Sequence, residues 1–196
     1  MWHTLDELPE SLDDTYERVL REIKRPNQDH ALHLLQGLIV AAQPLQVKEL
    51  AEVLAVDFDV EDGIPKLKTT WRWEDEEKAL LSSCSSLIAI VNIDHDDNDT
   101  SWDSSDSDTR VVQFSHFLVK EFLTSPRLAT PSRDVSYYHI LLEPAHTIMA
   151  QACLSILLHS DDSVDQSSVA KASPLGQYAA QYWVTHAQFE NVSLGL

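Results

Sequence analysis

Ser115 and His116 are neighbours in the chain, and a hydroxyl nucleophile beside an imidazole base is a pairing used in acyl transfer. A serine hydrolase often holds its nucleophile on the strained turn of a Gly-x-Ser-x-Gly motif, and the sequence contains no such motif. The hydroxyl of Ser115 is better explained as the N-cap of a following helix. We therefore predict that the protein is not an enzyme, and a hydrolase is a distant alternative.

Nine histidines raise the question of a metal site, but their spacing does not favour one. His139 and His146 lie two helical turns apart, and neither a His-Glu-x-x-His motif nor a cysteine pair accompanies them. Cys84 and Cys153 stand far apart in apolar helical segments, which predicts two small buried side chains rather than a disulfide. We expect no metal and no cofactor, and unpaired cysteines favour a reducing, cytoplasmic location.

The segment Asp94–Asp108 is the most acidic part of the chain, with seven Asp, four Ser and no Lys or Arg. Asp94, Asp96 and Asn98 have the spacing that opens a calcium-binding loop, but Asp99 stands where such a loop needs glycine. The composition is typical of a disordered loop. A solvated loop is therefore preferred over a calcium site.

The charge balance restricts the partners of the protein. Fourteen Lys and Arg stand against 32 Asp and Glu, so that the formal net charge is −18. Such a chain is repelled by nucleic-acid phosphates and by anionic membranes, and its four glycines are too scattered to form a phosphate-binding loop. No apolar run approaches the roughly 18 residues of a membrane-spanning helix. We expect neither a nucleic-acid nor a membrane partner.

His116 stands where the periodicity of the sequence changes, within the segment Arg110–Leu123. Residues 110–114 alternate in the manner of a β-strand, and from Phe117 to Leu123 the apolar residues recur at helical spacing. A strand that leads directly into a helix, with an imidazole at the junction, is either a structural corner or a ligand-sensing one. The residues alone leave both interpretations open.

Apolar spacing and turn residues predict the elements around this junction. They are a helix between Ser11 and Pro26, a helix between Asn27 and Gln43-Pro44, a helix over Gln46–Ala55, a loop over 56–73, a helix over Glu74–Leu87, and strands over Leu87–Ile93 and Arg110–Phe114. Helices that include a helix-turn-helix, followed by a hairpin with a long tip, have the order of a winged helix, and the acidic stretch would form the wing.

The last third of the chain predicts further helices. Pro126 and Pro131 mark a linker, Ile140–His159 is one long apolar-striped helix, and a final helix begins at Ser173-Pro174. That helix carries Tyr178, Tyr182 and Trp183, which most simply pack internally but whose exposed side is our candidate interaction surface.

The fold class predicted from these elements is mainly α, a winged helix followed by an incomplete helical domain. The expected domain division is a leading segment 1–10, a winged-helix domain 11–125 with a disordered acidic wing at 94–109, a linker 126–136 and a helical domain 137–196.

Four stretches also resemble a known family, in the family's own order: Leu8–Leu20, Pro44–Ala51, Val112–Leu123 and Pro174–Trp183. They are similar to the segment that follows the NTPase core in fungal NACHT-type STAND proteins, NLR-like proteins of which many end in ankyrin repeats. The resemblance implies a winged helix of the type also named after GPI inositol-deacylase, followed by the start of a helical domain.

In that family the winged helix folds back on the nucleotide-binding domain and holds it in the ADP state, and a histidine at the strand-to-helix corner points to the β-phosphate. His116 is the matching position, and Phe117–Val119 depart from the small polar residue that commonly follows. The family's phosphate loop is absent. The resemblance therefore implies a non-catalytic regulatory module whose partner is an intramolecular NACHT-type domain. The alternative is a stand-alone protein-protein adaptor.

Overall fold

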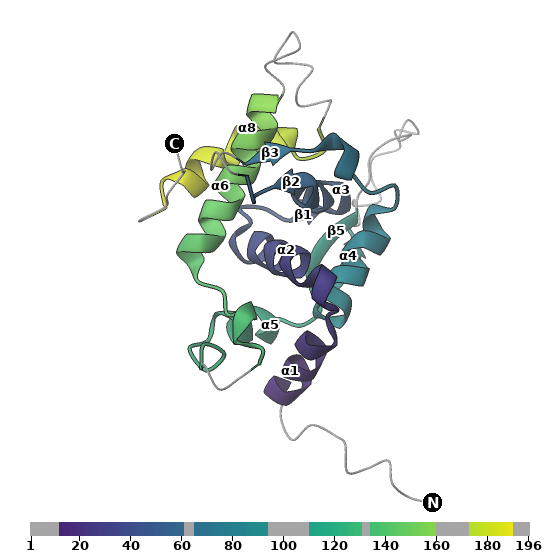
Figure 1. Cartoon of the computed structure of the whole chain (residues 1–196), viewed down its shortest axis with the longest axis vertical. Helices are drawn as coiled ribbons and strands as arrows, with labels where there is room; N and C mark the ends of the chain where they lie inside the picture. Colours follow the sequence, from purple (N-terminus) through teal and green to yellow (C-terminus); the bar gives the residue numbers. More distant parts are fainter. Residues whose placement is uncertain (1–11, 61–64, 94–109, 131–133, 160–172, 190–196) are drawn as a thin grey trace, which may run out of the picture.

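A computed structural model describes residues 12–60, 65–93, 110–130, 134–159 and 173–189 (Figure 1). The described part is mainly helical, with two small antiparallel sheets, which confirms the predicted fold class at this level. The leading segment, the acidic loop 94–109 and residues 160–172 lie outside the described residues. Among the helices that are described, none has both the length and the apolarity needed to cross a membrane.

The N-terminal helices are α1 (Leu12–Glu22), the short η1 (Arg25–Asn27) and α2 (Gln28–Val40). Acidic residues open α1 and Arg21 lies in its last turn, as the helix dipole favours. In Figure 1, α2 lies in the middle of the molecule, and its buried residues are distributed around the helix rather than confined to one face. Asparagine is a favourable N-cap residue, and Asn27 is therefore expected to cap α2. Its side chain makes no capping hydrogen bond, and its amide donates instead to the carbonyl of Ser82 at 3.2 Å.

The predicted helix over Gln46–Ala55 is shorter in the structure and is preceded by a strand. Strand β1 (Leu45–Gln46) leads into α3 (Val47–Glu52) and then into the turn η2 (Val53–Ala55). A capping box begins α3, in which the side chain of Glu49 accepts a hydrogen bond from the backbone N–H of Gln46 at 2.8 Å. The two-residue strand was missed because it is too short to show an alternating pattern.

The segment 56–73, predicted as a loop, contains regular structure. Strand β2 (Val56–Asp57) pairs with β3 (Lys66–Leu67), and the turn η3 (Thr69–Trp71) follows. Helix α4 (Glu76–Cys84) and η4 (Ser85–Leu87) then replace the single helix expected over Glu74–Leu87.

The predicted hairpin is confirmed as β4 (Ile88–Asn92) and β5 (Arg110–Phe114), which pair antiparallel. Strand β1 pairs with the other edge of β5, so that the sheet order is β1–β5–β4. Leu45, Val112 and Ile90 lie in one row across the three strands. Since side chains alternate between the faces of a sheet, this row and the Ile88–Phe114 pair share the face that contributes to the core.

The remaining elements are α5 (Leu118–Thr124), η5 (Ser136–Tyr138), α6 (Leu142–His159) and α8 (Gly176–Ala187). Helix α6 packs between α2 and α8. The approach of α6 to α2 is close at Gly37, where an added Cβ would lie 3.3 Å from the Sδ atom of Met149. A larger residue at position 37 would therefore press on the Met149 side chain, so that glycine suits the close approach of these helices.

The buried apolar side chains form one core cluster that extends across the predicted linker. Leu34 of α2, Met149 of α6 and Tyr178 of α8 all belong to it. Leu128 and Val135, which lie within the predicted linker 126–136, are also buried in this cluster. The residues on both sides of the linker thus share a core, while the domain boundaries themselves remain a prediction.

Candidate functional site

The junction between β5 and α5 is held by backbone and side-chain contacts on both sides of His116. Ser115 donates from its backbone nitrogen to the carbonyl of Leu87 at 3.0 Å and from its hydroxyl to the carbonyl of Ser86 at 2.6 Å. The prediction that Ser115 caps the following helix is wrong, because the N-cap position of α5 is Phe117 and the hydroxyl of Ser115 bonds a carbonyl of η4. On the far side of the junction, Lys120 donates from Nζ to the carbonyl of Ile39 at 2.8 Å, which ties α5 to the end of α2.

The imidazole of His116 is oriented through its Nδ1 atom. This atom lies 3.2 Å from the backbone nitrogen of Leu118 and 3.2 Å from the hydroxyl oxygen of Tyr16. Because a backbone N–H can only donate, Nδ1 is an acceptor and the proton of a neutral ring lies on Nε2. The ring also stacks on Phe117, with centroids 4.5 Å apart and an interplanar angle of 29°.

The corner formed by His116 and Phe117 is exposed. Phe117 keeps 73% of its surface in solvent, the largest fraction among the exposed large apolar side chains of the described residues. Beneath them, burial and then the nearby charge of Asp13 raise the pKa of Tyr16, so that the phenol remains a neutral O–H donor to His116. The corner therefore presents an imidazole N–H and an apolar ring, which suit a phosphate oxygen and an apolar partner surface respectively.

The three aromatic residues predicted as an interaction surface differ in their exposure. Tyr178 is fully buried, whereas Tyr182 and Trp183 are half-buried and pack one side against the core. The hydroxyl of Tyr182 donates to Oε1 of Gln43 at 3.1 Å. Tyr178 therefore holds α8 in place from inside the protein, and only Tyr182 and Trp183 retain surface that a partner could contact.

A polar network connects Tyr178 to two histidines that sequence reasoning did not pair. The hydroxyl oxygen of Tyr178 lies 3.0 Å from the backbone nitrogen of Ala42 and 2.9 Å from Nε2 of His186. Nδ1 of His186 lies 2.9 Å from Nδ1 of His146 on α6, and Phe189 stacks on the ring of His146 with centroids 4.1 Å apart. His139, the expected neighbour of His146, takes no part in this network.

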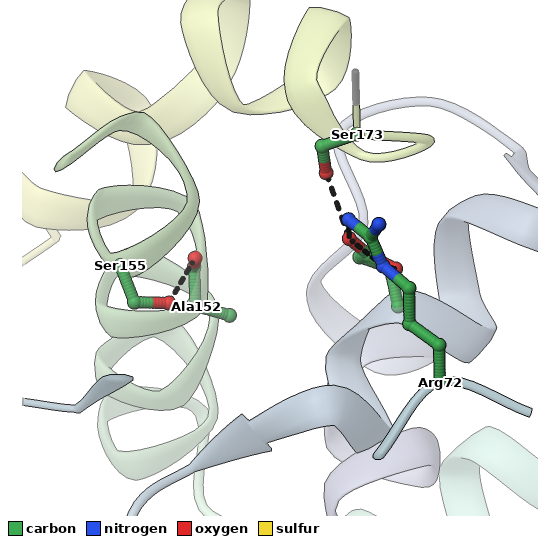
Figure 2. A network of polar contacts seen from close by, with 5 residues as sticks. Arg72, Ala152, Ser155 and Ser173 are labelled. Atoms are coloured by element: carbon green, nitrogen blue, oxygen red, sulfur yellow. Dashed lines mark hydrogen bonds and ion pairs between the residues drawn. The ribbon is translucent and has the colours of Figure 1, made fainter. Parts of the chain in front are cut away.

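A second, partly buried network joins α3, the residue after η3 and the segment that precedes α8 (Figure 2). The Nε atom of Arg72 lies 3.1 and 3.0 Å from the two carboxylate oxygens of Glu52, whose side chain is only 3% exposed. Ser173 donates its hydroxyl to Oε1 of the same carboxylate at 2.9 Å. Figure 2 shows Arg72 and Ser173 converging from separate parts of the chain on this group. The sequence offered no signal for it, because its members lie 20 and 121 residues apart.

A shallow groove of about 590 Å³ lies between the end of α2 and the sheet. Its lining is mainly apolar, with contributions from Leu38, Pro44, Val91 and Val111, and Lys120 is the one cationic side chain among the described residues that line it. None of the predicted site residues lines the groove.

The described residues contain no group of three or more His, Cys, Asp or Glu side chains placed to hold a metal ion. Cys84 and Cys153 are both free and buried. Burial raises the pKa of both thiols, that of Cys153 to about 12, so that neither is a reactive thiolate at neutral pH.

Comparison with known proteins gives one informative similarity. The chain is 30% identical over 185 residues to the "Azaphilone pigments biosynthesis cluster protein L" of the fungus Monascus ruber. The match covers 93% of this chain but 36% of that protein, so that the chain spans about a third of its relative's length. No family model matches the chain, and no solved structure matches it.

Proposed function

We propose that the chain is a non-catalytic regulatory module of a STAND-type NTPase, in which a winged helix and the start of a helical domain pack on a NACHT-type nucleotide-binding domain. The observation that carries the proposal is the oriented, exposed His116 at the corner between β5 and α5. The sequence resemblance implies a nucleotide-sensing histidine at this corner, and a neutral imidazole that accepts at Nδ1 has its Nε2 proton to offer a phosphate oxygen.

The order of the elements supports the winged-helix assignment. Along the chain, α2, β1, α3, α4, β4 and β5 follow one another, and the sheet order is β1–β5–β4. Three helices and a three-stranded sheet of this connectivity, with a long connection between the last two strands, fit a winged helix. The connection 94–109 lies outside the described residues.

Charge supports a protein partner over a nucleic acid. Helix α4 has the position along the chain at which a helix-turn-helix protein carries its DNA-reading helix. It begins with Glu76 and Glu77 and contains a single cation, Lys78. With a net charge of −18, each phosphate contact would be made against repulsion.

Binding in trans tests the proposal. The chain is immobilised and titrated with a fungal NACHT-type nucleotide-binding domain loaded with ADP or with a non-hydrolysable ATP analogue. We expect binding at least tenfold tighter in the ADP state. Neither nucleotide alone should bind the chain in calorimetry, since it lacks a phosphate loop. Tight ADP binding by the chain alone, or no binding of the ADP-loaded domain, would contradict the proposal.

Replacing His116 by alanine is expected to weaken binding of the ADP-loaded domain by about 10- to 150-fold, because a hydrogen bond to a charged group contributes about 1.5–3 kcal/mol. His159→Ala, an exposed histidine at the end of α6, is the matched control and should bind like the original protein. Circular dichroism must show an unchanged fold, since His116 also accepts from Leu118 and Tyr16. Equal binding by both variants would remove His116 from the interface.

A stand-alone adaptor is the second candidate, and two exposed tryptophans favour it. Trp71 and Trp73 are 49% and 46% exposed, and the residue between them, Arg72, is anchored to Glu52. Rigidly held tryptophans are frequent energetic centres of protein interfaces. Nucleotide-independent binding that survives His116→Ala but is lost in the double variant Trp71→Ala/Trp73→Ala would favour the adaptor.

A further inference from the structure

The network of Ala42, Tyr178, His186 and His146 has one arrangement of protons in which each buried hydrogen is donated. The backbone N–H of Ala42 donates to the Tyr178 oxygen, and the Tyr178 O–H donates to Nε2 of His186. His186 is then protonated on Nδ1, and this N–H donates to Nδ1 of His146. The reverse arrangement would leave the O–H of the fully buried Tyr178 without an acceptor among the described residues.

This arrangement has no place for an additional proton. Nε2 of His186 accepts the hydrogen bond from the Tyr178 hydroxyl. If Nε2 were protonated it would become a donor, and the phenol proton would lose its acceptor. Protonation of His146 on Nδ1 would place two N–H groups against each other across 2.9 Å. Either event breaks a hydrogen bond and introduces a positive charge beside a fully buried ring.

The groups that face the histidine pair offer no compensating negative charge. From α8 the pair meets the phenol of Tyr178, whose pKa burial raises to about 12, and from α6 the buried thiol of Cys153 lies close to that phenol. From α3, Glu49 acts electrostatically on Tyr178, as does Tyr182 from α8, and burial raises the pKa of the Glu49 carboxyl as well. No carboxylate in the described residues forms an ion pair with His146 or His186.

We propose that this histidine pair is a proton-sensitive latch, which holds α8 on the α2–β1 turn only while both rings are neutral, so that acidification releases α8 from the rest of the fold. Tyr182, which bonds Gln43 of the same turn, and Ser173, which bonds Glu52, hold α8 at neighbouring points without a titrating histidine. The latch is therefore the pH-dependent contact within a larger docking surface.

The direction of the effect follows from the two imidazoles. Burial, and then the neighbouring His146, lower the pKa of His186 to about 4, and burial lowers the pKa of His146. The released state, in which the rings return toward an ordinary pKa near 6.5, binds more protons than the docked state between these values. The docking is thus fully stable above about pH 6.5 and weakens as the pH falls toward 4. For each proton that is taken up on release, the equilibrium constant for release rises about tenfold when the pH falls by one unit within this window.

Hydrogen exchange of the α8 amides measures the release directly. Exchange of residues 176–187 is followed by mass spectrometry at pH 7, 6 and 5, with rates corrected for the intrinsic pH dependence of exchange. We expect corrected α8 exchange to rise about tenfold or more between pH 6 and 5. The amides of α4, which packs on α2 and α3, should keep their protection.

The double variant His146→Gln/His186→Gln removes the titrating groups while keeping amide donors and acceptors at both positions. Its α8 exchange should change less than twofold over the same pH range, whereas His159→Gln, an exposed histidine on α6, should behave like the original chain. If the double variant does not fold, the single variant His146→Gln at the half-buried position should reduce the pH dependence to the part that His186 contributes. The proposal is overturned if the variants retain the original pH slope, if α8 shows no slope, or if α4 opens in step with α8.

Discussion

Replacement of Arg72 by alanine is expected to lower the free energy of unfolding by about 3 kcal/mol, the lower end of the range for breaking a buried ion pair. The reason is the position of Glu52, whose side chain is 3% exposed and, among the residues that the structure describes, would keep only the Ser173 hydroxyl as a partner. The lower end applies because Arg72 itself is 35% exposed, so that water can reach part of the site. Urea unfolding followed by far-ultraviolet circular dichroism measures the change.

Arg127→Ala is the matched control for this experiment. Arg127 pairs with Asp13 at 3.5 Å, with side chains that are 78% and 42% exposed, and surface pairs of this kind contribute about 0–1 kcal/mol. Arg72→Lys should fall between the two variants, since lysine keeps the charge but loses the planar fork that meets both carboxylate oxygens. A cost for Arg72→Ala no larger than that of Arg127→Ala would contradict the prediction.

Removing both charges distinguishes the free-energy cost of leaving the Glu52 carboxylate unpaired from the net contribution of the Glu52–Arg72 ion pair to stability. The double variant Glu52→Leu/Arg72→Met is expected to recover a large part of the stability lost in Arg72→Ala, because no buried charge is left without a partner. The network would then serve to position Arg72, and with it the flanking Trp71 and Trp73, rather than to stabilise the fold.

The elements that the sequence predicted best are those in which burial repeats with a clear period. The alternation in Arg110–Phe114 marks one face of β5, and the change to helical spacing after His116 marks α5. The position of His116 at the corner therefore follows from periodicity alone. The orientation of its ring does not, because it depends on Tyr16, which is 100 residues away.

The parts that could not be predicted depend on which side chains meet after packing. Ser115 and Asn27 were assigned as caps from local preference, yet each bonds a carbonyl from a distant segment, because a short polar side chain takes whichever acceptor packing brings near. The His146–His186 contact spans 40 residues, and helical spacing within α6 or α8 carries no information about the partner across the interface. Apolar periodicity reports which face is buried but leaves its polar contacts undetermined.

Replacement of Tyr178 by alanine is expected to have the largest effect on α8. Tyr178 is among the largest fully buried side chains, and its hydroxyl connects the α2–β1 turn to the histidine latch. Truncating a buried aromatic side chain costs about 3–5 kcal/mol, which corresponds to an increase of more than about 100-fold in the exchange of the α8 amides at pH 7. Hydrogen exchange measured by mass spectrometry tests this value, with the α4 amides as an internal reference.

Two further variants separate the contributions of the ring and the hydroxyl. Tyr178→Phe keeps the buried ring but leaves the Ala42 N–H and Nε2 of His186 unpaired, which should cost about 1–3 kcal/mol. Tyr182→Phe removes only the exposed bond to Gln43, so that α8 exchange should change by less than about tenfold.

Equal exchange in Tyr178→Ala and Tyr182→Phe would show that α8 does not depend on its buried tyrosine. Loss of α4 protection together with α8 would mean that the helix opens only when the shared core unfolds, and docking of α8 could then not be regulated separately from folding.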